Sequence, residues 1–141
     1  MPAPANASEA IAQRLLTSTA IAALVGARVF PSKPTQETAA DYIVYFRQGG
    51  GDVKTIDGRS GLQSHEVRIE CYSRTQAVAE QILAAVASRL CGDRAAGVAA
   101  WRDRPNGVHG CFAQGDGDEL VTEDAFQVSG QTFSLWFSPQ T

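Results

Sequence analysis

Three patterns in the sequence predict an α+β fold, with two helices packed on a mainly antiparallel sheet of about four strands. Apolar residues recur at three- and four-residue spacing between Val78 and Leu90, which is typical of an amphipathic helix. Apolar and polar residues alternate over residues 65–72, which is typical of a half-buried strand, and residues 127–137 close the chain as another strand. The predicted order is α-β-β-α-β-β, in a single domain over residues 1–141.

The first segment predicts a broken helix. Residues 1–7 are rich in alanine and proline, and we expect them to be disordered. Asn6 followed by Glu9 is typical of a capping box at a helix start. The hydroxyl residues at 17–19 weaken the helix, so the segment up to Gly26 is either one helix with a break or two helices. Residues 28–30 are then briefly extended, and Pro31 and Pro34 exclude regular structure around them.

Residues 42–46 are apolar on both faces, which indicates a central strand covered on each side. The glycines at 49–51 lower strand propensity, so residues 48–61 are predicted to form a mobile loop that becomes ordered on docking. Residues 65–72 then pair antiparallel with the first strand, as a hairpin with a long loop.

The second half begins with the most regular helix. Ser73 and Gln76 are interpreted as its capping box, and Gly92 ends it. Residues 93–107 form an irregular connection, and residues 108–114 a strand. Residues 116–124 form an acidic loop, or a turn with a short strand at Leu120 and Val121.

Composition favours protein partners over nucleic acid. The net charge is −3, and phosphate binding needs a clustered positive surface. Ten of the twelve cationic residues are arginines, whose planar group suits carboxylates at protein interfaces. The three cysteines lie far apart in sequence and indicate a reducing compartment, not a disulfide framework. No apolar run approaches the roughly 20 residues that span a bilayer.

No arrangement of residues predicts a catalytic or metal site. His109 and Cys111 share a strand face if the strand alternates regularly, and His65 or Cys71 could join them, but structural zinc needs four ligands. A packed cysteine and a histidine at a strand edge are the simpler interpretation. The acids of residues 116–124 do not match a calcium loop, because Leu120 and Val121 stand where a donor and glycine are required. We therefore expect no cofactor, no metal and no enzymatic activity.

Several segments, taken in order, resemble one family. They are a short N-terminal helix, Ala22-Ala23-Leu24-Val25-Gly26-Ala27-Arg28-Val29-Phe30-Pro31, Asp41-Tyr42-Ile43-Val44-Tyr45, Asp57-Gly58 with Gly61-Leu62, and Val67-Arg68-Ile69-Glu70-Cys71-Tyr72-Ser73-Arg74-Thr75, followed at once by an alanine-rich helix. This order is similar to that of the tail-completion, or tail-terminator, proteins of siphophages and gene-transfer particles. The resemblance covers roughly residues 10–92. One departure is Asp41, where the family often has proline.

The resemblance implies a structural virion protein located in the tail at its head-proximal end and assembled in the host cytoplasm. Such proteins form a sixfold ring that caps the tail tube, stops its polymerisation and joins the tail to the head. The implied partners are copies of itself, the tail tube protein, a head-closure or connector protein, and DNA that passes through the lumen without sequence-specific binding. Two alternatives stay open: a head-closure or stopper connector, and a small hydrolase or ligand-binding domain that uses His109 and Cys111.

Function is then expected at subunit interfaces, where cations of residues 93–107 meet the acids of a neighbouring copy. Trp101 is either an interface anchor or a cap on its own core. The predicted interface residues are Gly50, Asp57, Arg59, Arg94, Trp101, Arg102, Arg104, Asp116, Asp118 and Glu119.

Overall fold

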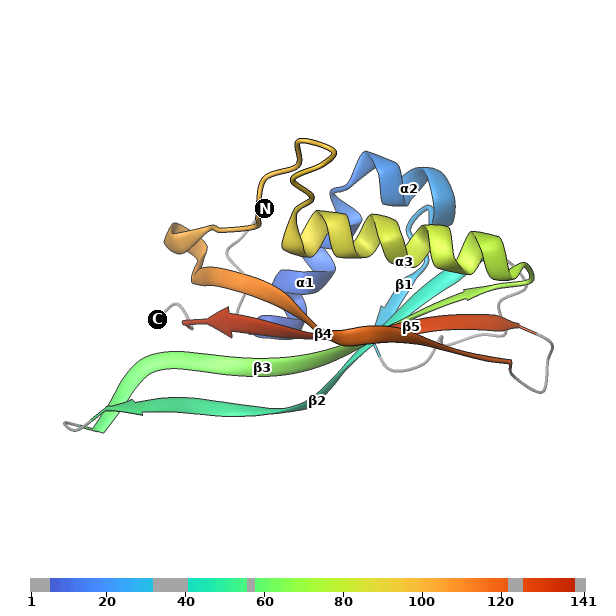
Figure 1. Ribbon diagram of the computed structural model, residues 1–141. Coiled ribbons are helices and arrows are strands. Elements are labelled where there is room, and N and C mark those ends of the chain that lie inside the picture. The colour runs from blue at the N-terminus through green and yellow to red at the C-terminus, as the bar shows by residue number, and fades with distance from the viewer. Residues whose placement is uncertain (1–5, 32–40, 56–57, 122–125, 139–141) are drawn as a thin grey trace.

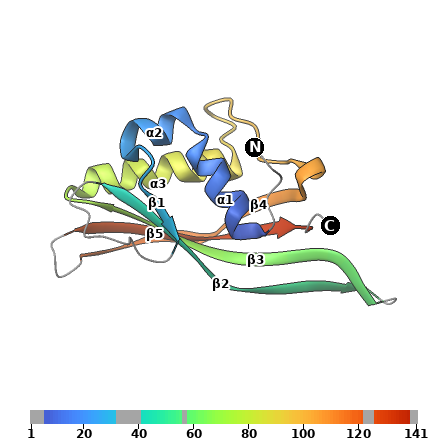
Figure 2. The same ribbon diagram turned by 180° about the vertical axis from the view of Figure 1, so that it is seen from behind.

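A computed structural model of the chain describes residues 6–31, 41–55, 58–121 and 126–138. Within these residues the fold is α+β, as predicted, but it has five strands and three α-helices where the sequence predicted about four and two. The strand order is β1-β2-β3-β5-β4, and the helices lie together on one face of the sheet (Figures 1 and 2). The other face carries no helix among the described residues.

The N-terminal segment forms two helices, α1 (Ala7–Leu16) and α2 (Thr19–Val25). The Asn6 side chain accepts a hydrogen bond from the Glu9 backbone N–H at 2.9 Å, which is one of the two bonds of the predicted capping box. Ser18 caps α2 by accepting from the Ile21 N–H at 3.3 Å, so its hydroxyl separates the two helices. The expected disorder is wrong for residues 6 and 7, and its remainder, residues 1–5, lies outside the described residues.

The sheet does not follow chain order. The short strand β1 (Val29–Pro31) pairs parallel with β2 (Tyr42–Thr55), and β3 (Gly58–Ser73) pairs antiparallel with β2. The last strand, β5 (Gln127–Phe137), lies between β3 and β4 (Val108–Val121), antiparallel to both. β4 is therefore an edge strand along its whole length.

Helix α3 (Gln76–Cys91) packs Ala79, Ile82, Val86 and Leu90 toward the sheet, at the predicted three- and four-residue spacing. Its predicted capping box is wrong. The residue at the N-cap is Thr75, whose side chain makes no capping hydrogen bond, and the Ser73 hydroxyl instead accepts from the Thr75 N–H at 3.2 Å. The strand thus continues through Ser73, and the helix begins two residues later than predicted.

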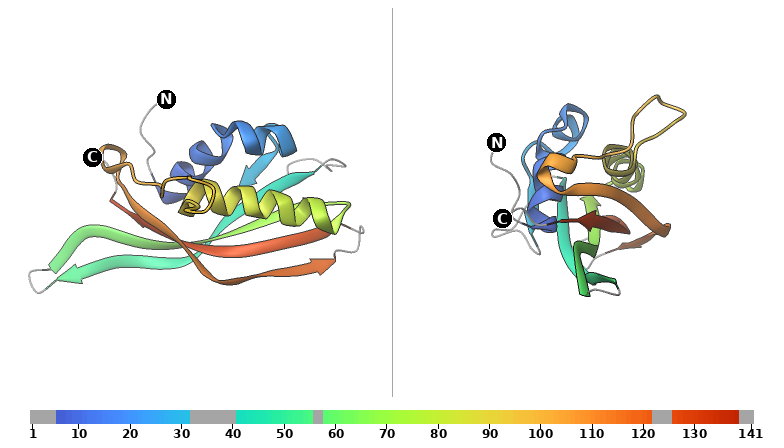
Figure 3. Two further views of the ribbon diagram at one scale, coloured as in Figure 1. Left: turned by 45° about the horizontal axis from the view of Figure 1, so that its top comes forward. Right: turned by 90° about the vertical axis from the view of Figure 1, so that its left-hand side faces the viewer.

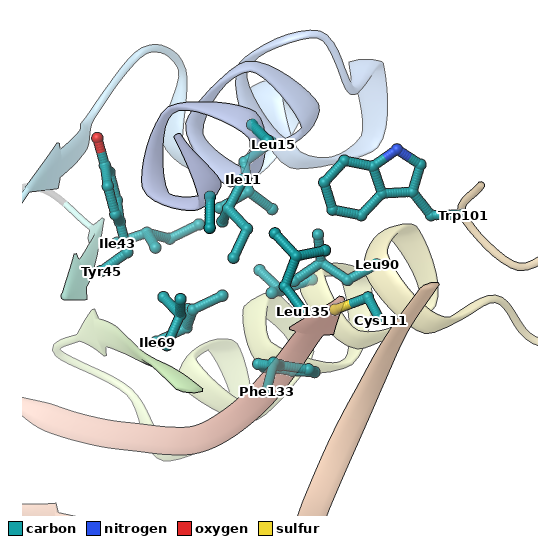
Figure 4. Packing of buried hydrophobic residues seen from close by; sticks show 14 of the residues in the cluster. Ile11, Leu15, Ile43, Tyr45, Ile69, Leu90, Trp101, Cys111, Phe133 and Leu135 are labelled. Carbon is teal, nitrogen blue, oxygen red and sulfur yellow. The ribbon is translucent and has the colours of Figure 1, made fainter. Parts of the chain in front are cut away.

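The main core fills the space between the helices and the sheet (Figure 4). Its fully buried side chains come from every layer: Ile11 and Leu15 from α1, Leu90 from α3, and Ile43, Ile69, Phe133 and Leu135 from the strands. Burial of each such side chain contributes about 1.5–3 kcal/mol. The strand at 42–46 is covered on both faces, as predicted, because Tyr42 and Val44 belong to a second cluster on the sheet's other face.

Candidate assembly interface

The β2–β3 hairpin extends beyond the rest of the sheet as an arm, seen at the lower left of Figures 1 and 3. β5 ends opposite Gln63, where Phe137 is its partner, whereas β2 and β3 continue to pair as far as Thr55 and Gly58. Past Gln63 the hairpin is two-stranded over the described residues. An isolated two-stranded hairpin is only marginally stable in water, so the arm gains stability from any surface that packs against it.

The predicted mobile loop at residues 48–61 is therefore wrong for the residues described. Glycine weakens a strand, but here each of Gly49, Gly50 and Gly51 has a partner, in Glu66, His65 and Ser64. Irregularities at Arg47/Gly49 and Asp52/Lys54 lie at the two ends of the glycine run, where glycine tolerates a bulge. Of the predicted interface residues, Gly50 and Arg59 lie on the arm, while Asp57 is outside the described residues.

Residues 93–107 form an irregular connection, as predicted, but one with defined internal contacts. Asp93 forms an antiparallel bridge with Val98, and its carboxylate accepts from the N–H groups of Ala95 and Ala96 at 3.1 and 3.3 Å. Gly92 has a φ of +80°, and a side chain there would lie 2.7 Å from the backbone N of Ala100. The connection then passes through a 3-10 turn, η1 (Arg104–Asn106). Its three arginines, Arg94, Arg102 and Arg104, are exposed.

Trp101 caps its own core. Its side chain is 6 % exposed and packs within the main cluster (Figure 4). The Arg14 guanidinium lies 5.4 Å from the ring centroid. Of the two alternatives that the sequence left open, the structure has the packed one, and the indole is not presented to a partner in this conformation. The neighbouring Arg102 and Arg104 are exposed and accessible to a partner.

Of the two alternatives for the acidic segment, the strand at Leu120 and Val121 is confirmed, but it belongs to β4, so residues 116–119 are strand and not loop. Asp118 pairs with Gly130 and Glu119 with Ser129, on the far half of β4, after an irregularity that begins at Gln114. Asp116 lies within that irregularity, and residues 122–125 are outside the described part of the chain. The cationic connection precedes β4 at one end of the sheet and the acids lie toward the other (Figure 1). From Val108 to Glu119 the strand spans roughly 30 Å, which separates the two segments along the sheet.

The helix-free face of the sheet carries an aromatic cluster that the sequence analysis did not identify as a unit. The rings of Tyr42 and Tyr72 stack with centroids 4.6 Å apart, and Phe126 contacts both edge-on. The Arg74 guanidinium lies 4.2 Å from the Phe126 ring centroid. The only signal was the apolar character of residues 42–46 on both faces, since Phe126 joins the cluster from just before β5, far away in the sequence.

Next to these rings lies the polar face of β3, which the alternation over residues 65–72 predicted. Arg68 and Glu70 form an ion pair at 3.5 Å, and the Tyr72 hydroxyl donates to Glu70 at 3.2 Å. Burial, reinforced by the Glu70 charge, raises the pKa of Tyr72 to about 12. The guanidinium of Arg68 covers Gly130, whose lack of a side chain makes room for it. Arg68 and Glu70 are thus half-buried and paired with each other, unlike the side chains of a fully solvated strand face.

The histidines and cysteines do not form a catalytic or metal site in the described residues. His109 and Cys111 were expected to share a strand face, but His109 is the extra residue of a bulge between Val108 and Gly110. The bulge leaves His109 exposed, hydrogen-bonded to the Ser138 hydroxyl at 2.9 Å, while Cys111 is buried. His65 is buried and contacts the Gln63 side chain at 2.7 Å. Burial raises the pKa of the Cys71 thiol well above its usual range, so this thiol is unreactive.

No set of three or more metal-ligating side chains occurs within the part of the chain that the structure describes. No helix there is both long and apolar enough to cross a membrane.

Comparison with known proteins identifies a family and a solved structure with the same fold. The family described as Tail completion protein gp17 matches residues 9–114. A solved chain described as "Virion of native gene transfer agent (GTA) particle" has the same fold, with a TM-score of 0.68 and 22% identity over 90% of each chain. Among curated proteins no match is found.

The family that matches is one of structural virion proteins and not of enzymes, and the solved virion chain shares the fold. The chain belongs to the tail completion family, because the family match spans most of its length. It is a component of the virion tail and assembles there with other virion proteins.

Proposed function

We propose that the protein forms a ring at the head-proximal end of the tail tube, where it stops tube polymerisation and joins the tail to the head. Its membership of the tail completion family supports a role at the end of the tail. The single observation that carries the proposal is the β2–β3 arm. Past Gln63 it pairs only with itself among the described residues, so it is suited to lie on a neighbouring copy or on the tube.

The distribution of charge supports a head-to-tail contact between copies. Exposed Arg94, Arg102 and Arg104 lie at one end of the sheet, and Asp118 and Glu119 lie on the β4 backbone toward the other end. A contact that joins unlike ends of two copies is heterologous, and it closes into a ring when the rotation between copies is right. Six copies in such a ring would leave a central channel for DNA. The negative net charge of −3 disfavours adhesion of DNA to the wall, since acidic groups release no counterions from phosphate.

The proposal is tested by removing the protein from assembling particles and imaging the products by electron microscopy. We expect tails of uncontrolled length and filled heads without tails, because nothing caps the tube or presents a surface to the head. Re-supply of the wild-type chain restores joined particles of uniform length. A head-closure or stopper protein would give another result: tails of normal length beside heads that have lost their DNA. That outcome would overturn the tube-capping proposal in favour of the connector.

A further inference from the structure

Two of the three cysteines, far apart in sequence, meet in the folded chain. Cys91 is the last residue of α3, and Cys111 lies on β4 opposite Leu135. Both line one small cavity of about 210 Å³, together with Trp101, Arg102 and Ala113. Cys71 is fully buried on β3 and does not line it. The sequence spacing of twenty residues gave no sign of this pair.

The two thiols lie close enough to interact across this cavity, and they differ in acidity. Interaction with the Cys111 thiol and with the Ala113 backbone lowers the pKa of Cys91 despite burial. The interaction with Cys91, burial and the negative charge of Cys91 together raise the pKa of Cys111. Cys91 is half-buried, so it is the more accessible and the more nucleophilic of the pair.

We propose that Cys91 and Cys111 are a disulfide site, reduced in the cytoplasm and oxidised by a low-molecular-weight disulfide once the particle is outside the cell. The Cys91 thiolate attacks one sulfur of the small disulfide, forms a mixed disulfide and releases the other half as a thiolate. Cys111 then passes its proton to that released thiolate, and its sulfur attacks Cys91. This closes the Cys91–Cys111 bond and expels the second small thiolate, which takes a proton from water. Two protein thiols are oxidised, and one small disulfide is reduced to two thiols.

The bond would fasten the C-terminal end of α3 to the edge strand β4. It would close a loop over residues 92–110, which contains exposed Arg94, Arg102 and Arg104. Closing a loop of this length constrains the unfolded chain, and it also limits how far the cationic connection departs from the body. The inference goes beyond the proposed function and does not depend on it, since the same two thiols meet in the isolated chain.

The test uses the purified full-length chain, reduced and then incubated with oxidised glutathione at neutral pH. After free thiols are alkylated under denaturing conditions, mass spectrometry of peptides should show a Cys91–Cys111 link and an alkylated Cys71. The thermal midpoint should rise by on the order of 5–10 °C and fall again when reductant is added. The Cys71→Ala variant should behave in the same way, whereas Cys91→Ser and Cys111→Ser should each abolish the link.

Circular dichroism establishes which variants are folded. If a variant is unfolded, the link found by mass spectrometry in the wild-type chain still tests the proposal. The proposal is overturned if the wild-type chain stops at a glutathione adduct on Cys91, or if the linked peptide contains Cys71. It is also overturned if all three thiols remain free.

Discussion

Arg14 and Arg89 hydrogen-bond each other's main chain reciprocally: each Nε donates to the backbone carbonyl oxygen of the other residue, and both bonds are 3.1 Å long. The two residues lie in the last turns of α1 and α3, so each cation also faces the negative end of the opposite helix. A terminal nitrogen of Arg89 further donates to the Thr17 hydroxyl at 3.1 Å. This pair joins the C-terminal ends of α1 and α3, two of the helices that cover the core.

Replacing Arg89 with methionine keeps the length of the side chain and removes its donors. We expect the free energy of unfolding to fall by about 1–2 kcal/mol, because the Arg14 carbonyl oxygen and the Thr17 hydroxyl each lose the hydrogen bond that Arg89 donates. Urea unfolding of the free subunit measures it. Arg94→Met is the matched control and should change stability by no more than about 0.5 kcal/mol, since Arg94 is exposed. Equal effects from the two changes would show that the reciprocal bonds do not stabilise the fold.

Gly92 and Gly97 form a matched pair that separates backbone strain from steric conflict. Both have positive φ, +80° and +73°, which disfavours any L side chain. A side chain at Gly97 meets nothing within 4 Å, whereas one at Gly92 would meet the Ala100 backbone. We expect Gly97→Ala to cost about 1 kcal/mol of unfolding free energy and Gly92→Ala about 3 kcal/mol or more. Thermal and urea unfolding of both variants give the comparison, and equal costs would contradict the close approach at Gly92.

Trp101 and Arg102 are neighbours that the structure assigns to different roles. Trp101→Ala should lower the free energy of unfolding of the isolated subunit by about 3–5 kcal/mol, because it removes a large buried ring from the main cluster. Arg102→Ala should stay within about 0.5 kcal/mol of wild type, because the side chain is exposed. Circular dichroism during urea unfolding measures both. A stable Trp101→Ala subunit would return Trp101 to the set of interface anchors.

The elements that the sequence predicted well are those whose pattern is set by one local contact. Val67, Ile69 and Cys71 alternate because one face of β3 lies on the core, and Ile82, Val86 and Leu90 repeat because one side of α3 does. The place of β5 between β3 and β4 was not predictable in this way. It depends on which strand pairs with the edge of β3 that β2 leaves open, and no local pattern encodes that choice.

The errors at the candidate site have the same physical origin. Gly49, Gly50 and Gly51 lower strand propensity locally, but pairing with β3 outweighs it. His109 and Cys111 follow a period of two in sequence, and a bulge of one residue places them on different faces. The Cys91–Cys111 contact joins a helix end to a strand. It depends on the packing of α3 on the sheet, which sequence spacing does not reveal.

The backbone amide hydrogens of the arm should exchange fast in the free subunit and slowly in assembled tails. In the free subunit we expect residues 50–55 and 58–62 to exchange faster than the β3 segment at 65–72, because the arm is two-stranded while that segment is paired on both sides. In assembled tails the arm should be protected, because a neighbour covers it. Hydrogen exchange followed by mass spectrometry compares the two states. Equal exchange of the arm in free and assembled protein would show that no partner lies on it.

The contact between copies is tested by reversing charge at the cationic end. The double change Arg102→Glu and Arg104→Glu should give a subunit of wild-type stability, because both side chains are exposed. We expect that subunit to fail in assembly, leaving overlong tubes or unjoined heads, since like charges would then face each other across the contact. Charges at the rim of an interface affect the rate of association and the register more than the affinity. Because salt screens exposed charges, the assembly defect should be greatest at low salt. Electron microscopy of particles and circular dichroism of the subunit measure the two outcomes.

Rescue distinguishes direct pairing from a general effect of charge. Asp118 and Glu119 lie on the far half of β4, where a neighbour's cationic connection would meet them in a head-to-tail ring. Adding Asp118→Lys and Glu119→Lys to the double reversal restores opposite signs across that contact, and it should recover part of the joined particles. The same two lysines in an otherwise wild-type chain should impair assembly, because they would face the native arginines. Normal virions from the double reversal alone would show that Arg102 and Arg104 make no contact between copies.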